Sequence, residues 1–298
     1  MKNEKLKIYG LAEGHTAFRN MIQTDSDKTK LGVSSLDFLL RGGLRPGEVM
    51  VMSGKTSVGK TGVVVNFALN SIKINPNKKA LFFSFEMSLP SIVERVYQIE
   101  FQKTSGELIS DIDRLNIKDS HLKNLYYITE PCPVQMIENY INYFKETVAA
   151  DVGLVVIDYL GLVQSRGASA YEKQSESARQ IKEIAKRTDT SILVLTQVSK
   201  QYNSETEIDL NSTRDSGSIV EAADFFLGIW KNKETPETET DYNLTLGLLK
   251  NRRGMIGTTQ IKMSKKNLAI SETTITPQPR IPKGYKSFYD NEPEEDVI

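Results

Sequence analysis

One glycine-rich segment places the strongest constraint on how this chain can fold. Residues 54–61 read Gly54-Lys55-Thr56-Ser57-Val58-Gly59-Lys60-Thr61 and match the pattern G-x-x-x-x-G-K-[ST] at every fixed position. The apolar run 48–53 precedes them, and a segment that we expect to be helical follows as far as about Ile74. A strand, a tight loop and a helix in this order form a P-loop, which is typical of α/β folds.

The residue types in this loop suit a nucleoside triphosphate. Glycine residues let successive backbone N–H groups point at phosphate oxygens, and the N-terminus of the helix adds partial positive charge. Lys60 can reach the β- and γ-phosphates, and the Thr61 hydroxyl can bind Mg²⁺. The sequence therefore predicts that residues 54–61 bind ATP together with Mg²⁺.

Apolar segments of strand length recur along the chain, with helical segments between them. We expect strands at 80–85, 153–157, 191–196, 225–230 and 243–250. Continuous apolar strands separated by helices indicate a mostly parallel sheet that is covered by helices on both faces. A turn at 254–257 would lead into a last strand, 258–264, and complete a C-terminal β-hairpin.

Polar side chains follow three of the expected strands at their carboxyl ends. They are Glu86, Asp158 and Gln197. Because the carboxyl ends of parallel strands share one edge of the sheet, where ligands bind, these side chains should lie near the P-loop. Asp158 could then serve the magnesium ion, and Glu86 could accept the proton of a water that attacks the γ-phosphate. Gln197 can both donate and accept hydrogen bonds, so it could sense the γ-phosphate or that water.

The overall charge does not exclude a polyanionic partner. The net charge is zero, yet residues 290–298 hold five acids and no base, so the rest of the chain carries an excess of about +5. No stretch is apolar enough to span a membrane, and the N-terminus lacks the apolar core of a secretory signal. The only cysteine, Cys132, allows neither an internal disulfide nor a cysteine-based zinc site. We therefore expect a cytoplasmic protein.

The two ends of the chain differ from its middle. Residues 1–30 are polar, with one short helix expected over Leu11–Gln23, and we predict that they form an arm. Ser34 to Asp37 fit a capping box that would begin a short helix through Leu40. Residues 274–298 contain prolines and the acidic end, and we expect them to be disordered. The catalytic domain would then span residues 31–273.

Six further segments, taken in order with the P-loop, are similar to one family. They are residues 42–47, 83–88, 156–160, 196–199, 214–219 and 250–254. In this pattern the chain resembles the C-terminal motor domain of DnaB-type replicative helicases, within the RecA-like P-loop ATPases. The resemblance runs from about residue 31 to residue 271, and seven motifs in the right order are highly specific. It implies a RecA-like core and an ATP hydrolase that acts as a DNA helicase.

The resemblance assigns roles to individual residues at the nucleotide. It makes Glu86 the general base, Asp158 the magnesium-associated acid and Gln197 the residue that couples nucleotide to DNA. Arg95 falls where the family has an arginine near the nucleotide. Lys250 and Arg252 would reach the nucleotide of a neighbouring subunit and stabilise the charge that develops on its γ-phosphate.

The same resemblance implies how the protein would use DNA. Arg214, Asp215 and Gly217 would lie in a loop that lines a central pore and contacts the backbone of single-stranded DNA. The implied assembly is a ring, of six subunits, that moves 5′ to 3′ and meets a helicase loader or a primase. Only about 30 residues precede the motor here, however, where the family carries a helical domain that recruits primase. Leu11–Gln23 could instead act as a shortened arm on the adjacent subunit.

Two other classes of protein remain open from the sequence alone. A RecA-like recombinase would form filaments on DNA rather than closed rings, although residues 214–219 favour the helicase. A nucleotide-gated adaptor would join or regulate the helicase of a partner, and the short N-terminal region and acidic tail motivate that alternative. Such an adaptor would bind ATP tightly with negligible turnover, despite an intact Glu86.

Overall fold

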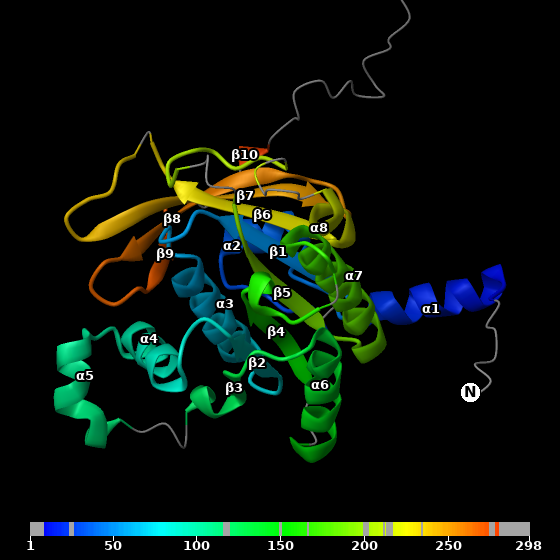
Figure 1. Cartoon of the computed structure of the whole chain (residues 1–298), viewed down its shortest axis with the longest axis horizontal. Coiled ribbons are helices and arrows are strands. Elements are labelled where there is room, and N and C mark those ends of the chain that lie inside the picture. Colours follow the sequence, from blue (N-terminus) through cyan, green and yellow to red (C-terminus); the bar gives the residue numbers. More distant parts are fainter. Residues whose placement is uncertain are drawn as a thin grey trace, which may run out of the picture.

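A single mixed sheet forms the centre of the molecule. The computed structural model describes residues 9–23, 27–115, 120–148, 151–165, 167–198, 203–210, 212, 217–233, 235–273 and 278–279. Within these residues the sheet has ten strands in the order β10-β8-β7-β6-β1-β5-β4-β2-β3, with β9 beside β8. Helices lie on both faces of the sheet (Figure 1). The predicted α/β class and mostly parallel sheet are confirmed.

Six of these strands run parallel, and the P-loop strand is the second of them, between β6 and β5. They are β1 (Val49–Gly54), β2 (Lys79–Ser84), β3 (Leu125–Ile128), β4 (Val152–Asp158), β5 (Ser191–Gln197) and β6 (Phe225–Lys231). β1 pairs in parallel with β5 on one side and with β6 on the other. Every residue of β1 and of β4 is buried. Burial on both faces is why these strands read as continuous apolar runs in the sequence.

Antiparallel strands extend the sheet beyond β6. They are β7 (Asp241–Asn251), β8 (Gly257–Ser264), β9 (Ile270–Glu272) and β10 (Gln278–Pro279). β7 and β8 form the predicted hairpin, paired from Asp241 opposite Ser264 to Leu248 opposite Gly257. Figure 1 shows these strands at the edge of the sheet next to β6. This hairpin therefore lies on the same side of the molecule as the strand that follows the candidate DNA loop.

Alternate residues of each strand enter two separate cores, because neighbouring strand residues point to opposite faces. Met50 and Met52 of β1 belong to one core, which α2 (Ser34–Leu39), α3 (Lys60–Ile74) and α4 (Leu89–Phe101) cover. Val49 and Val51 belong to the other core, which α6 (Val134–Val148), α7 (Ala170–Thr188) and α8 (Gly217–Ala222) cover. The P-loop strand is thus held from both sides.

Helix α2 begins at Ser34 as predicted, but the predicted capping box is wrong. Its N-cap is Val33, which makes no side-chain cap hydrogen bond. The carboxylate of Glu272, from β9, accepts hydrogen bonds of 2.9 Å from the backbone N–H groups of Ser34 and Ser35. Asp37 turns back and accepts hydrogen bonds from the loop before the helix. A carboxylate from a distant strand therefore takes the place of the local cap.

The segment between β2 and α6 holds elements that we did not predict from the sequence. Besides α4 and β3 they are α5 (Ser105–Asp111), η2 (Ile112–Arg114) and η3 (His121–Asn124); a further short 3₁₀ helix, η4 (Leu160–Leu162), follows β4. Helix α4 packs against α3. It begins after Ser88 with a proline in its first turn, a signal typical of helix starts. The sequence thus contained a signal for α4 that we did not use.

The helix predicted near the N-terminus is present as α1 (Leu11–Gln23). Figure 1 shows it projecting away from the sheet and its covering helices. It has no buried residue, and Leu11, Phe18 and Ile22 are 91%, 57% and 55% exposed. No helix among the described residues is long and apolar enough to cross a membrane.

Two residues of the expected tail lie on the sheet. Gln278 and Pro279 form β10, which pairs antiparallel with Thr258 and Gly257 of β8. The rest of the segment 274–298 lies outside the described residues. The acidic end is therefore not placed relative to the sheet.

Candidate nucleotide-binding site

The loop between β1 and α3 borders a cavity at the carboxyl edge of the parallel strands. The cavity has a volume of about 520 Å³. Residues 56–62 line its floor, and four residues that the sequence analysis selected line its walls: Glu86, Arg95, Asp158 and Gln197. The structure therefore brings together the P-loop and the polar ends of β4 and β5, together with Glu86 just beyond the end of β2.

Two glycines of the loop are required by their surroundings. Gly59 has a φ of +103°, in the left-handed region, and a Cβ there would lie 2.6 Å from Cε of Met263. Gly54 needs no special backbone angle, but a Cβ there would lie 2.5 Å from Cγ2 and 2.8 Å from the carbonyl oxygen of Ile229. A side chain at either position would distort the loop or push β1 away from β6.

Lys60 is buried at the start of α3 and donates hydrogen bonds to the loop itself. Its Nζ lies 2.7 Å from the carbonyl oxygen of Gly54 and 2.9 Å from that of Lys55. Burial lowers the pKa of Lys60 to about 8, against the opposing attraction of Asp158 and Glu86. Charged oxygens bind an ammonium group more strongly than carbonyl oxygens do. Phosphate oxygens would therefore be preferred partners for Lys60.

Thr61, the residue after Lys60, and Asp158 provide two adjacent oxygen atoms. The hydroxyl of Thr61 donates a hydrogen bond of 2.7 Å to Oδ2 of Asp158. Burial raises the pKa of Asp158, while this hydrogen bond and the ammonium of Lys60 oppose the shift. A hydroxyl and a carboxylate are hard oxygen donors that suit Mg²⁺, which keeps several of its ligands as water or phosphate. The pair therefore fits a magnesium site, and the ion would neutralise charge on phosphate oxygens.

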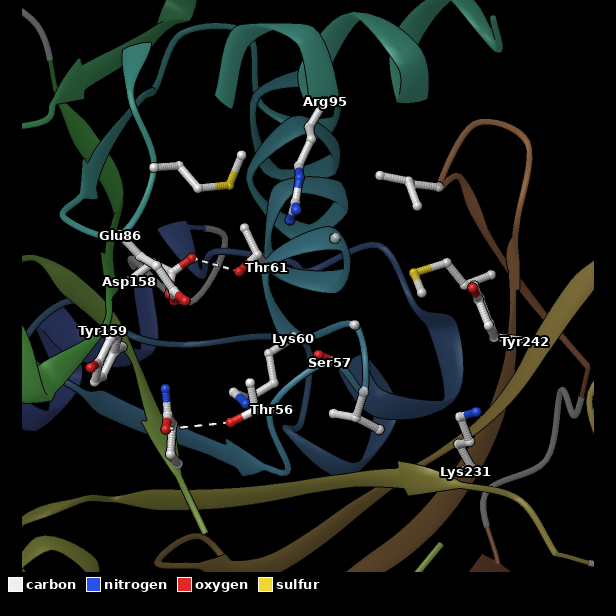
Figure 2. A pocket seen from close by; sticks show the side chains of 17 residues that line it. Thr56, Ser57, Lys60, Thr61, Glu86, Arg95, Asp158, Tyr159, Lys231 and Tyr242 are labelled. Carbon is white, nitrogen blue, oxygen red and sulfur yellow. Dashed lines mark hydrogen bonds between the residues drawn. The ribbon is translucent and has the colours of Figure 1, made fainter. Parts of the chain in front are cut away.

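Glu86 and Arg95 complete the wall on this side. Figure 2 shows Glu86 next to Asp158, whereas Arg95 points from α4 towards the start of α3. Glu86 is exposed, so water in the cavity can reach its carboxylate. A carboxylate placed beside the phosphate site can take a proton from attacking water.

Gln197 lies at the end of β5, beside the first residues of the loop. Its Oε1 is 3.4 Å from the hydroxyl of Thr56, which donates to it. Gly54 is also its direct partner in the pairing of β1 with β5. A change in the loop can therefore reach Gln197 through one hydrogen bond and one strand pair.

Lys250 and Arg252 lie beside the amino-terminal ends of the parallel strands, whereas the P-loop lies at the carboxyl ends. Asn251, between them, pairs with Phe225, which pairs with Met50 of β1. Met50 is four residues from Gly54, or about 13 Å along the strand. Lys250 donates to the carbonyl oxygens of Val220 and Ala223, at 2.6 and 2.8 Å, at the end of α8. Neither cation lines the cavity of its own chain.

The three residues expected to contact DNA are only partly placed. Arg214 and Asp215 lie outside the described residues. Gly217 is the first residue of α8, the short helix whose last turn binds Lys250. The structure thus describes where the expected loop rejoins the fold and not the loop itself.

Several residues that line the cavity were not selected from the sequence. They are Met87, Tyr159, Lys231, Tyr242, Met263 and Leu268. Met87 and Tyr159 fall inside segments that we had matched to a family, so the sequence contained a signal for both. The other four come from β6, β7, β8 and the turn after β8, and no motif of the sequence marks them. Their presence depends on how antiparallel strands pair.

Comparison with known proteins agrees with this geometry. Residues 29–272 match the family model of the DnaB-like helicase C-terminal domain. The chain belongs to the DnaB-like helicase family. This match covers the whole P-loop site, both candidate cations at the opposite edge and the helix that follows the expected DNA loop.

Sequence relatives agree with the family assignment. A probable replicative DNA helicase of Trieres chinensis is 30% identical over 252 residues, which are 78% of this chain and 54% of the relative. The replicative DNA helicase DnaB of Mycoplasma genitalium is 31% identical over 239 residues, 73% of this chain and 51% of the relative. The chain thus spans about half the length of these curated relatives.

Solved structures confirm the RecA-like fold expected of this DnaB-like chain. An ATPase domain of known structure has a TM-score of 0.75 at 17% identity, over 90% of this chain and all of that domain. A DnaB-like replicative helicase, solved in a study of its interactions with primase, has a TM-score of 0.72 at 17% identity. That match covers 90% of this chain and 68% of the other. At 17% identity, these structural similarities show the fold alone.

Proposed function

We propose that this chain is the ATP-hydrolysing motor of a DNA helicase that acts in DNA replication. The observation that carries the proposal is the meeting of Lys60, Thr61, Asp158 and Glu86 at one cavity. These side chains supply a cation for phosphate, two oxygens for Mg²⁺ and a base for water. Membership of the DnaB-like family supports DNA as the track on which such a motor acts.

In the proposed reaction, water attacks the γ-phosphate of ATP and Glu86 accepts its proton. The bond between the β- and γ-phosphates breaks, so that ADP and phosphate leave. Lys60 and Arg95 stabilise the negative charge of the phosphates, and the N–H groups of the loop orient them. Gln197, bonded to Thr56, senses whether the γ-phosphate is present.

The active site would be completed by a second copy of the chain. Lys250 and Arg252 cannot reach their own cavity, because they lie near the start of β6, about 13 Å from the P-loop along the strands. In a ring of six subunits, each pair would reach the γ-phosphate bound by the neighbour and act as the fingers of that site. The exposed apolar side chains of α1 support residues 1–30 as an arm on an adjacent subunit.

DNA would pass through the centre of this ring. Arg214, Asp215 and Gly217 would contact the backbone of one strand, and hydrolysis would move them stepwise in the 5′ to 3′ direction. Contacts to the sugar-phosphate backbone do not depend on the base sequence, which suits a motor that must move along any strand. A primase or a helicase loader is the proposed protein partner, since a structurally similar helicase was solved in a study of its interactions with primase.

ATP turnover with and without single-stranded DNA tests the proposal directly. We expect DNA to stimulate hydrolysis by the unaltered chain and Arg252→Ala to abolish it, with both proteins forming the same ring by mass. Arg187→Ala is the matched control. Arg187 lies on α7, is also about half-exposed, and pairs with the carboxylate of Glu138 on α6. Turnover that responds neither to DNA nor to Arg252→Ala would contradict the motor and favour a nucleotide-gated adaptor.

A further inference from the structure

The cavity has a second wall, which the proposed chemistry does not use. Lys231, Tyr242, Met263 and Leu268 line it. Figure 2 shows Lys231 and Tyr242 on the side of the P-loop opposite Glu86, Asp158 and Tyr159. Three of the four side chains are apolar or aromatic, whereas the charged groups Glu86, Arg95 and Asp158 belong to the first wall. The two walls therefore suit chemically different parts of one ligand.

The position of the phosphate groups decides which part of a nucleotide meets this second wall. Lys60 and the pair Thr61 and Asp158 fix the phosphate and magnesium end of the cavity. Met263, from β8, lies against the residues that flank Lys60 and Thr61, since a Cβ on Gly59 or on Gly62 would lie 2.6 or 3.1 Å from its side-chain atoms, and Tyr242 beside it lies across the P-loop from Glu86 and Asp158 (Figure 2). A ligand whose γ-phosphate lies beside Glu86 must therefore extend its nucleoside towards Met263 and its strand partner Tyr242.

The ring of Tyr242 is held in place before any ligand binds. It is half-buried and packs against the core beneath α3. The ammonium groups of Lys231 and Lys265 lie 5.7 and 5.0 Å from its centroid, within the range of cation–π attraction. Both ammonium groups are paired with Glu237, at 2.9 and 3.4 Å. Two cations joined by one carboxylate therefore restrict the ring, which lowers the entropy lost on binding.

We propose that Tyr242 is the surface on which the nucleobase of the bound nucleotide packs, with Lys231 beside it. The proposal rests on the proposed ATP site and adds the part of that site which recognises the nucleoside. Aromatic rings bind bases through their faces with little regard to base identity, because every base has a π-face. The apolar neighbours Met263 and Leu268 complete a wall from which a base excludes water.

Binding of two ligands separates this contact from the phosphate contacts. Isothermal titration would measure MgADP, which carries a base, and magnesium tripolyphosphate, which does not, on the full chain. We expect Tyr242→Ala to weaken MgADP about tenfold and to leave tripolyphosphate within about twofold. Tyr242→Leu, which keeps apolar packing under α3, should behave as Tyr242→Ala does. Tyr242→Phe should bind MgADP as the unaltered chain does, because the ring is retained.

Three results would overturn the proposal. Equal weakening of both ligands by Tyr242→Leu would mean that the residue supports the loop rather than the base. Unchanged binding of both ligands would place the base elsewhere. A loss in Tyr242→Phe as large as in Tyr242→Ala would assign the contact to the hydroxyl. Since MgADP binding needs neither hydrolysis nor DNA, failure of the helicase function leaves these outcomes unaltered.

Discussion

Nη1 of Arg252 lies 3.3 Å from Oδ1 of Asp224, whose other oxygen accepts a hydrogen bond of 2.6 Å from Lys182. Asp224 and Lys182 are both nearly buried, whereas the side chain of Arg252 is 51% exposed. Asp224 also accepts a hydrogen bond from the backbone N–H of Val49, at the start of the P-loop strand. The carboxylate therefore keeps buried partners when Arg252 leaves it.

This difference in burial predicts that substitutions of Arg252 and of Asp224 change stability by very different amounts. Arg252→Ala should change the free energy of unfolding by less than about 1 kcal/mol, because exposed ion pairs contribute little. Asp224→Ala should lower it by about 3 kcal/mol or more, because Lys182 is left nearly buried without its charged partner. Urea unfolding followed by circular dichroism measures both. A large loss in Arg252→Ala would show that Arg252 is a structural residue and not a free finger.

Mixing two inactive variants tests whether the site spans subunits. Lys60→Ala removes the cation that binds phosphate and keeps Arg252. Arg252→Ala keeps the P-loop intact and removes the cation that would act on the neighbouring site. In mixed rings about a quarter of the interfaces would join an intact P-loop to an intact finger, so hydrolysis should reappear. ATP turnover of each variant alone and of their mixture is the measurement. If the mixture remains as inactive as its parts, Lys60 and Arg252 do not act at one shared interface.

Glu86→Gln separates nucleotide binding from hydrolysis. Loss of the base should lower the rate of turnover by at least about a hundredfold, while the affinity for ATP stays close to that of the unaltered chain. Glu94→Gln is the matched control, since Glu94 is an exposed carboxylate on α4 that does not line the cavity. Turnover that survives Glu86→Gln would require another group to accept the proton.

The sequence predicted those parts of the site that depend on strand ends and local motifs. Residues 54–61, Asp158 and Gln197 each follow an apolar strand, and a parallel sheet brings such ends to one edge whatever the strand order. The fold class followed from the same alternation. These predictions succeeded because they depended only on the order of apolar strands and helices along the chain. They required no knowledge of contacts between distant segments.

The parts that the sequence did not predict depend on contacts between distant segments. Glu272 caps a helix that begins 238 residues before it, and no local pattern marks that pairing. Tyr242 reaches the cavity only because β7 lies two strands beyond β1. For Lys250 and Arg252 only the family resemblance proposed a role. The structure adds that both lie at the far edge of the sheet.

Cys132 should react slowly in the folded chain. It is 7% exposed, and burial raises the pKa of its thiol to about 11. Since the thiolate is the reactive form, the rate of alkylation by iodoacetamide should still rise with pH above 9, whereas in urea it should level off near the usual thiol pKa of about 8.5. Mass spectrometry of the labelled protein follows both rates. A fast reaction of the folded chain at pH 7 would show an activated thiol instead.

The exposed face of α1 leads to a prediction about how the proposed ring assembles. Leu11, Phe18 and Ile22 lie seven and four residues apart, so they share one side of the helix, and all three face solvent in the single chain. An apolar stripe of this kind is stable when a partner covers it. Replacing all three by serine should therefore shift the mass in sedimentation from a ring towards smaller species.

The matched control for α1 is Tyr143→Ser, on α6, which removes an apolar side chain that is 67% exposed. It should leave the mass unchanged. If the α1 variant dissociates, its ATP turnover should fall as well, because Lys250 and Arg252 then have no neighbour to reach. If the α1 variant keeps the full ring mass, the arm does not hold subunits together, and the contacts between the catalytic domains alone must do so.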